Sequence, residues 1–177
     1  MIAGIAQMLG KERNYYLFDS FEGLPECREI DGPAAKSFQS SPPSPANYFN
    51  CSTEPAFAAE AMKLALGGDL SRVRIVKGWF DDTLAETEIN EPIALLRLDC
   101  DWYDSTLTCL DLLFPLVADN GLIIIDDYLH FEGCSRAVHD YLAKNKSAEN
   151  IRQFDNNTIY LTKKYKRYNA ENFVSKS

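Results

Sequence analysis

The 177-residue sequence contains two histidines and five cysteines, and it has no long apolar run. The cysteines form no Cys-x-x-Cys pair, are odd in number and lie partly within apolar segments, so metal-thiolate sites and disulfide frameworks are both disfavoured. We therefore expect a reducing compartment, the cytoplasm. No segment reaches the roughly 20 apolar residues of a membrane span, and residues 1–9 lack the charged flank and long apolar core of a signal peptide.

Basic residues are also scarce, with 18 Lys and Arg against 26 Asp and Glu and a net charge of −8. This balance disfavours a nucleic-acid partner, because phosphate binding depends on clustered basic side chains. The one basic run, within residues 163–167, is interpreted as solvated chain, and residues 165–177 as a flexible tail. The hydrophobic content of 46% is enough for a buried core, so residues 1–177 are interpreted as a single domain.

Carboxylates follow two strongly apolar runs. Asp99 comes after ALLRL, and Asp126 and Asp127 come after LIII. Such runs are typical of buried parallel strands, and ligands bind beyond the carboxyl ends of these strands. Crowded carboxylates repel one another unless a cation compensates, and oxygen ligands suit Mg²⁺, Mn²⁺ or Ca²⁺. A single strand-end aspartate could equally cap a helix or close a turn, but two clusters together predict a divalent-metal site.

Strands are expected at residues 14–18, 72–77, 94–98 and 122–125, and a C-terminal hairpin is expected around Asn156-Asn157. Helices are expected between them. Strands that alternate with helices and finish in an antiparallel pair predict an α/β three-layer sandwich with a mostly parallel sheet.

Three of the expected helices have an apolar face that the spacing defines, and residues 2–9 look helical in composition. The helix that starts near Pro55 and stops at Gly67-Gly68 should bury Phe57, Ala61, Leu64 and Ala65. The helix between the two acidic clusters should bury Leu107, Leu110, Phe114 and Val117, and the helix after Gly133 should bury Ala137, Val138, Tyr141 and Leu142.

Residues 27–51 are polar and rich in proline, with Pro42, Pro43 and Pro45 close together. The segment is too long for an ordinary connection in a compact domain. We interpret it as a lid loop in which residues 29–50 close over a ligand.

Five motifs follow one another along nearly the whole chain. They are LFDSFEGLPE at 17–26, GWFDDTL at 78–84, LLRLDCDWYDST at 95–106, GLIIIDDY at 121–128 and GCSRAVHDY at 133–141. With these motifs the chain resembles the macrocin O-methyltransferase family, which are metal-dependent sugar methyltransferases acting on antibiotics and related natural products.

The resemblance implies a class I (Rossmann-like) methyltransferase fold, S-adenosylmethionine as cofactor, and Mg²⁺ or a similar cation at the active site. The implied reaction is O-methylation of a hydroxyl on a sugar or a sugar-bearing natural product. Asp99 then looks like the catalytic base and a metal ligand, and Asp126 and Asp127 like the remaining ligands. His130 and His139 rank below Asp99 as bases. Asp101 and Asp104 are expected to cap a helix that starts near Ser105, and Asp101 could also make an outer-shell contact.

The resemblance also implies a cofactor site. Asp19 occupies the acidic position after the second strand of such folds, where a carboxylate accepts hydrogen bonds from both ribose hydroxyls, and Ser20 and Phe21 would border it. Gly78, Trp79 and Phe80 match a segment that forms the adenine-side wall. Trp79 and Phe80 could equally be ordinary core residues.

The sequence departs from the family pattern at its start, because it shows neither the first strand nor the Gly-rich loop of class I methyltransferases. Residues 1–9 look like the helix that follows that loop. The absent strand would lie between those ending at Asp19 and Asp99, so unpaired sheet edges and self-association are expected. We favour a truncated form of a methyltransferase. A noncatalytic binding module, and a glycosyltransferase with Asp99-Cys100-Asp101 as its DxD motif, remain alternatives.

Overall fold

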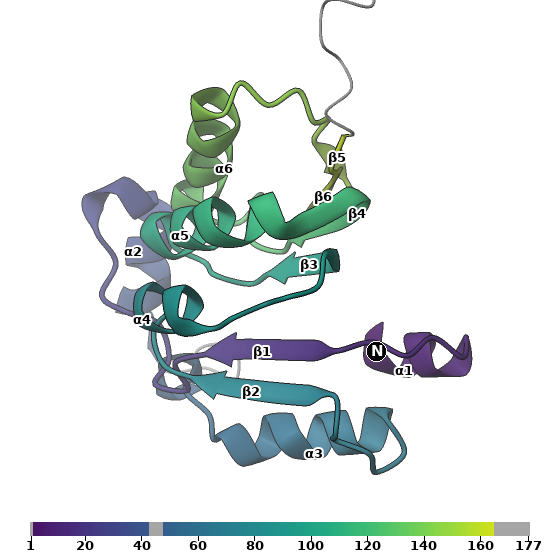
Figure 1. The fold of residues 1–177 in the computed structure, drawn as a ribbon. Helices are drawn as coiled ribbons and strands as arrows, with labels where there is room; N and C mark the ends of the chain where they lie inside the picture. The colour runs from purple at the N-terminus through teal and green to yellow at the C-terminus, as the bar shows by residue number, and fades with distance from the viewer. Residues whose placement is uncertain (1, 43–47, 165–177) are drawn as a thin grey trace, which may run out of the picture. The chain divides into compact units, whose positions relative to one another are not determined.

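The computed structural model describes residues 2–42 and 48–164 of the chain (Figure 1). The chain divides into two compact units. Unit 1 comprises Met1–Cys27 and Phe38–Glu88, and unit 2 comprises Arg28–Ser37 and Ile89–Ser177. The predicted flexible tail at 165–177 lies outside the described residues. Within the described ranges, no helix is long and apolar enough to cross a membrane.

Unit 1 is built on two parallel strands, β1 (Tyr15–Asp19) and β2 (Val73–Lys77). The register pairs Asp19 with Lys77, so both strands end at the same edge. The helices are α1 (Ile2–Met8), α3 (Pro55–Ala65) and α4 (Phe80–Glu86), with a 3₁₀ turn η2 at Tyr48–Cys51. Helix α3 lies along β2, as Figure 1 shows, and α4 contacts β1. The strands predicted at 14–18 and 72–77 are confirmed.

Helix α3 presents a different face to its unit from the one that the spacing predicted. Phe57 and Leu64 are 70% and 84% exposed, whereas Ala58, Met62 and Ala65 are half-buried. Of the predicted face, Ala65 alone is not exposed, so the prediction is wrong for Phe57, Ala61 and Leu64. Small side chains allow a helix to approach a strand closely, and α3 has apolar residues on two faces, between which periodicity cannot choose.

Unit 2 contains a four-stranded sheet in the order β3-β4-β6-β5. The strands are β3 (Ile93–Leu98), β4 (Val117–Ile125), β5 (Arg152–Gln153) and β6 (Ile159–Thr162). Strands β3 and β4 are parallel, and β6 is antiparallel to both β4 and β5, which confirms the predicted C-terminal hairpin.

Helices α5 (Tyr103–Leu113) and α6 (Glu132–Lys144) pack against each other in unit 2 (Figure 1). The core of this unit combines residues of both helices with inward-facing strand residues, among them Leu98, Leu110, Ile123, Ile125, Ala137, Val138, Tyr141, Ile159 and Leu161. The predicted inner face of α6 is confirmed for Ala137, Val138 and Tyr141, while Leu142 is half-buried.

The bounds of α5 differ from the prediction. The helix starts at Tyr103 rather than near Ser105, and it ends at Leu113. Phe114–Leu116 forms a 3₁₀ turn, η3, and Val117 already belongs to β4. Pro115 explains the stop, because proline cannot continue an α-helix. Phe114 and Val117 are nevertheless buried, as predicted.

The segment at 27–51 is more regular than the sequence analysis expected. It contains a 3₁₀ turn η1 (Glu29–Asp31) and a helix α2 (Gly32–Ser40), so the prediction of a loop is wrong for residues 29–40. Pro43 and Pro45 lie outside the described residues. Helix α2 begins on a tertiary contact, in which the Glu132 carboxylate accepts a hydrogen bond of 3.2 Å from the Ala34 N–H. A partner 98 residues away leaves no local signal in the sequence.

The strands form two separate sheets in the part of the chain that the structure describes. Among the described strands, β1 pairs only with β2. Strand β3 pairs only with β4 and has no described strand on its other side. No described strand precedes β1, since the first element is α1. The strands that end at Asp19 and Asp99 therefore belong to different sheets within the described residues.

Candidate functional site

The acidic residues of unit 2 gather where β3 and β4 end. Leu98 and Ile125 are register partners at the ends of these parallel strands, so Asp99 and Asp126 follow at the same edge. The Asp126 N–H donates a hydrogen bond of 3.0 Å to the Leu98 carbonyl, which extends the parallel pairing of β3 and β4 by one residue. The structure thus places Asp99 and Asp126, two of the three predicted metal ligands, at one edge of the sheet.

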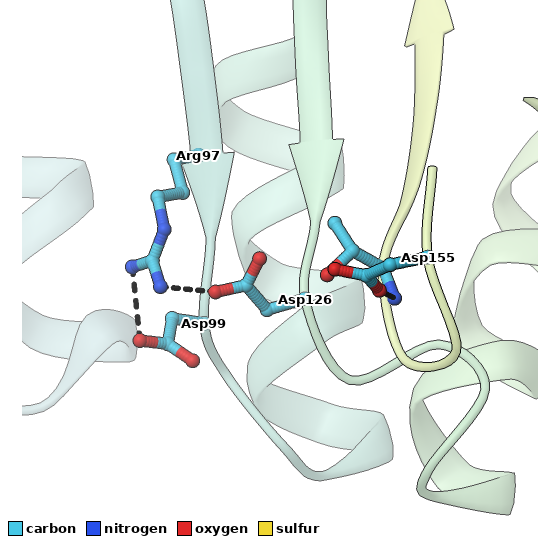
Figure 2. A network of polar contacts seen from close by, with 5 residues as sticks. Arg97, Asp99, Asp126 and Asp155 are labelled. Carbon is cyan, nitrogen blue, oxygen red and sulfur yellow. Dashed lines mark hydrogen bonds and ion pairs between the residues drawn. The ribbon is translucent and has the colours of Figure 1, made fainter. Parts of the chain in front are cut away.

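Arg97 lies between two of these carboxylates. Its Nη1 donates to Asp99 Oδ2 at 2.9 Å, and its Nη2 donates to Asp126 Oδ2 (Figure 2). Side chains two residues apart on a strand share a face, which places Arg97 beside Asp99. Ile124, the register partner of Arg97, stands two residues before Asp126. The sequence analysis gave Arg97 no role, although the spacing Arg-x-Asp after a strand could have indicated it.

Asp101 and Asp127 have the most perturbed carboxyl groups at this edge. Burial, and then the charges of Asp127 and Asp99, raise the pKa of Asp101 from 3.8 to about 8. Burial, and then the charges of Asp99 and Asp126, raise the pKa of Asp127 to about 7. Asp101 also has a left-handed backbone, with φ of 57°, which is uncommon for a residue other than glycine. Burial, reinforced by the neighbouring carboxylates, thus favours the protonated form of both groups near neutral pH.

The N-terminus of α5 is capped by a residue that sequence reasoning missed. Asp31 is only 2% exposed, and its Oδ1 accepts a hydrogen bond of 2.7 Å from the Tyr103 N–H while its Oδ2 accepts one of 2.6 Å from the Arg28 N–H. The Asp104 carboxylate instead pairs with the Arg28 guanidinium. The prediction that Asp101 and Asp104 cap this helix is therefore wrong. Asp31 fixes the loop that follows Asp99 and Asp101.

The chemistry of these carboxylates fits a hard divalent cation. Asp127 Oδ2 is buried and has no hydrogen-bond partner within the described residues, so it is an acceptor that a cation could satisfy. However, no three His, Cys, Asp or Glu side chains of the described ranges are grouped closely enough to hold a metal ion. In the structure, two of these carboxylates, Asp99 and Asp126, are paired with the Arg97 guanidinium.

The predicted ribose-binding residues form a tight turn at the end of β1 in unit 1. Asp19 is exposed, and its Oδ1 accepts a hydrogen bond of 2.6 Å from the Phe21 N–H. Ser20 Oγ accepts from the Glu22 N–H at 3.1 Å and donates to the Gly23 carbonyl at 3.2 Å. Phe21 is buried, with φ of 58°. One carboxylate oxygen of Asp19 thus holds the turn, and within the described residues Oδ2 has no hydrogen-bond partner.

The predicted adenine-side residues follow β2 in the same unit. The Gly78 N–H donates to the Asp19 carbonyl at 2.9 Å, so the two segments are adjacent. Gly78 has φ of 144°, and a Cβ there would lie 2.6 Å from Thr83 Cγ2, so glycine is required. Trp79 precedes α4 and is 40% exposed, while Phe80 is half-buried. The alternative of core packing therefore does not apply to Trp79.

The two histidines lie at the surface of unit 2. His139 is exposed on α6, and its Nε2 is 2.7 Å from the Tyr128 hydroxyl. His130 is also exposed, in the loop after Asp127. Within the described residues, neither imidazole forms a hydrogen bond or an ion pair with Asp99, Asp101 or Asp127.

A model of the family described as Macrocin-O-methyltransferase (TylF) matches residues 1–163. The chain belongs to this family. As a family member it is 33% identical over 152 residues to the demethyldecarbamoylnovobiocin O-methyltransferase of Streptomyces niveus, a match that covers 85% of this chain and 55% of the relative. It is 28% identical over 153 residues to the mycinamicin III 3''-O-methyltransferase of Micromonospora griseorubida, covering 85% of this chain and 57% of that protein.

Among solved structures, the O-methyltransferase NovP matches this macrocin O-methyltransferase family member with a TM-score of 0.75 and 28% identity, over 93% of this chain and 66% of that one. The fold is therefore the α/β fold of class I methyltransferases, as predicted. The chain spans about half the length of the curated relatives that it matches, namely 55% and 57%.

Proposed function

We propose that this chain carries the metal site and part of the cofactor site of an S-adenosylmethionine-dependent O-methyltransferase. The acceptor that we propose is a hydroxyl of a sugar or of a sugar-bearing natural product, since two relatives are named for O-methylation of novobiocin and mycinamicin compounds. The observation that carries the proposal is the delivery of Asp99 and Asp126 to one edge by the parallel strands β3 and β4. A cytoplasmic location and self-association stay predictions.

The proposed cofactor site uses the turn after β1. Asp19 Oδ1 is occupied by the Phe21 N–H, so Oδ2 is the oxygen that we assign to the ribose hydroxyls. Ser20 and Phe21 border it. The exposed ring of Trp79, together with Gly78 and Phe80, would form the adenine-side wall, because an aromatic face at the surface can stack on a base.

The proposed metal ligands are Asp99, Asp126 and Asp127, as carboxylate oxygens are the ligands that Mg²⁺ prefers. When bound, S-adenosylmethionine supplies an electrophilic methyl group and Mg²⁺ supplies positive charge that lowers the pKa of a neighbouring hydroxyl. The protein must then accept one proton. We assign this role to Asp99, which is exposed enough to reach an acceptor.

Asp101 is the alternative proton acceptor. A carboxylate that binds a cation is a weaker base, and burial raises the pKa of Asp101 to about 8, near the value suited to a general base. Mn²⁺ binding by two variants shows which of the two carboxylates is a metal ligand. If Asp99 is a ligand, Asp99→Asn loses Mn²⁺ binding and Asp101→Asn retains it, whereas equal losses in both would contradict this division.

The experiment that tests the proposal is calorimetric titration of S-adenosylmethionine into the 177-residue chain, with and without Mg²⁺. Micromolar binding is expected. Asp19→Asn should weaken it by about tenfold, which corresponds to the loss of one charge-assisted hydrogen bond. Asp119→Asn is the matched control, because Asp119 is exposed on β4 and belongs to neither site. A folded chain that binds no cofactor would favour the noncatalytic alternative for this polypeptide.

A further inference from the structure

Arg97 is the charged residue at the acidic edge that the proposed function does not use. Its side chain is only half exposed, and it forms ion pairs with both Asp99 and Asp126. Within the described residues, no other basic side chain forms an ion pair with either carboxylate. Figure 2 shows the guanidinium between the two carboxylates, reaching beyond the end of β3.

The backbone enforces this position. Asp99 follows β3 and stands two residues after Arg97, and Asp126 follows β4 and stands two residues after Ile124, the register partner of Arg97. The fork of a guanidinium can donate to two acceptors at once, which an ammonium group cannot match in geometry. The contact with both carboxylates therefore follows from strand register and side-chain type.

A divalent cation bound by Asp99 and Asp126 would meet this guanidinium. Arg97 is bonded to Oδ2 of each carboxylate, so a cation on these side chains would lie close to the guanidinium, and the two positive charges repel each other in a partly buried setting, where screening is weak. Arginine remains protonated at every physiological pH, so its charge cannot be removed by titration. A cation that takes Oδ2 of either carboxylate would displace the guanidinium from that side chain.

We propose that Arg97 is a positioning residue that acts as an internal competitor of the metal ion. In the metal-free protein its guanidinium holds Asp99 and Asp126 and offsets part of their charge, and a divalent cation binds these carboxylates by displacing it. This inference rests on the proposed function, because it takes the two aspartates as ligands.

Mn²⁺ titration, followed by calorimetry and by the loss of the free-ion electron paramagnetic resonance signal, tests the inference. Arg97→Gln, which removes the charge, should bind Mn²⁺ about tenfold more tightly than wild type, within the 5- to 150-fold range typical of coupled sites. Arg97→Lys, which keeps the charge without the fork, should fall between the two. Arg152→Gln is the control, since Arg152 is exposed on β5, at the far edge of the same sheet.

Thermal unfolding gives a readout that a purely structural role would not reproduce. Without metal, Arg97→Gln should unfold at a lower temperature than wild type, because Asp99 and Asp126 lose their counter-charge. Saturating Mn²⁺ should then raise its unfolding temperature by more than it raises that of wild type, because the variant gains more binding free energy.

The outcomes separate the two proposals. If wild type binds Mn²⁺ and a folded Arg97→Gln variant binds it equally or more weakly, Arg97 is not a competitor and the inference is overturned alone. If neither protein binds Mn²⁺, the metal site of the proposed function fails and the inference fails with it.

Discussion

At the scale of single residues, Asp101 and Asp127 are the side chains whose ionisation the fold opposes. Their pKa values of about 8 and about 7 lie above the ordinary 3.8 because both groups are buried near other carboxylates. An unfolded chain releases these protons near pH 4, whereas the folded chain holds them until pH 7 to 8. Stability is therefore fully present below about pH 4 and is lost as pH rises through these folded-state pKa values.

Asp101→Asn should remove part of this pH dependence. We expect its free energy of unfolding at pH 8 to exceed that of wild type by about 2 kcal/mol, after allowance for partial solvent screening, with little difference at pH 4. Thermal unfolding of the metal-free protein across this pH range measures the effect. Asp119→Asn, at an exposed position on β4, should follow wild type. A parallel shift of Asp101→Asn at both pH values would point to packing instead of charge.

The cysteines should divide into two reactivity classes. Cys100, Cys109 and Cys134 are buried, and the Cys100 and Cys109 sulfurs lie 3.6 Å apart. The Cys109 thiol and burial raise the pKa of Cys100, and burial raises the pKa of Cys134 to about 12. Since the thiolate is the reactive form, these three should resist alkylation until the chain unfolds.

Cys51 is exposed and should react first, and Cys27, which is half-buried, should react more slowly. Mass spectrometry after timed alkylation in buffer and in denaturant gives the count of modified thiols. Cys51→Ser should abolish the fast phase without changing the slow one. Early modification of Cys100 in the folded protein would contradict the burial described for the loop after Asp99.

At the scale of elements, the start of α5 depends on a cap from a distant segment. Asp31→Ala removes the acceptors of the Tyr103 and Arg28 N–H groups, and Tyr103 then begins the helix without a partner. We expect a loss of about 2 kcal/mol in the free energy of unfolding. Denaturant unfolding followed by the fluorescence of Trp102, which is buried next to Tyr103, measures it.

Asp104→Ala is the matched control for the cap. Asp104 lies in the first turn of α5, but its carboxylate forms an exposed ion pair with Arg28. Exposed ion pairs contribute about 0 to 1 kcal/mol, so this variant should lose much less stability than Asp31→Ala. If Asp104→Ala instead lost more stability than Asp31→Ala, Asp104 would cap the helix, as the sequence had predicted.

The sequence predicted the strands and what stands at their ends. Apolar runs located β3 and β4, and with them the edge at which Asp99 and Asp126 meet, because parallel strands carry their following residues to one side. Arg97 was equally predictable in principle, since its position two residues before Asp99 fixes the shared face. These features depend on short-range periodicity.

The features that the sequence did not predict depend on contacts between distant residues. The Asp31 cap joins residues 72 positions apart, and no local pattern reports it. On α3, the exposed pair Phe57 and Leu64 has helical spacing, and so do the half-buried residues Ala58, Met62 and Ala65, so periodicity alone cannot tell which set faces the unit. Helix α2 occupies a segment whose prolines suggested a loop, yet only the part beyond Ser40 is rich in them.

At the scale of the whole molecule, the two units have unequal cores. Within the described part of unit 1, the buried apolar residues are Ala3, Phe21 and Leu84. Unit 2 buries residues from β3, β4, β6, α5 and α6, among them Leu110, Ile123, Ile125, Val138, Ile159 and Leu161. Regions with few buried apolar contacts open at lower free energy, so unit 1 should be the less stable of the two.

Two spectroscopic signals, the fluorescence of one tryptophan and far-ultraviolet circular dichroism, should show whether the units melt separately. The chain has two tryptophans, so Trp79→Phe leaves Trp102, which is buried in unit 2, as the only fluorescent indole. Far-ultraviolet circular dichroism reports the helices of both units, including α1, α3 and α4. The first loss of dichroism should occur about 5 °C or more below the Trp102 transition. This difference corresponds to roughly 1 kcal/mol for a folding unit of fewer than about 100 residues.

The comparison of the two signals also decides how the chain is organised. If the dichroism and the Trp102 fluorescence of the Trp79→Phe variant fall together at every temperature, the chain unfolds as one cooperative domain, which is what its length and composition predicted. If they separate, the two units unfold as separate folding units. In the wild-type chain, saturating S-adenosylmethionine should then move the earlier dichroism transition upward, because the proposed cofactor residues Asp19, Ser20, Gly78 and Trp79 all belong to unit 1 and a ligand stabilises the unit that binds it.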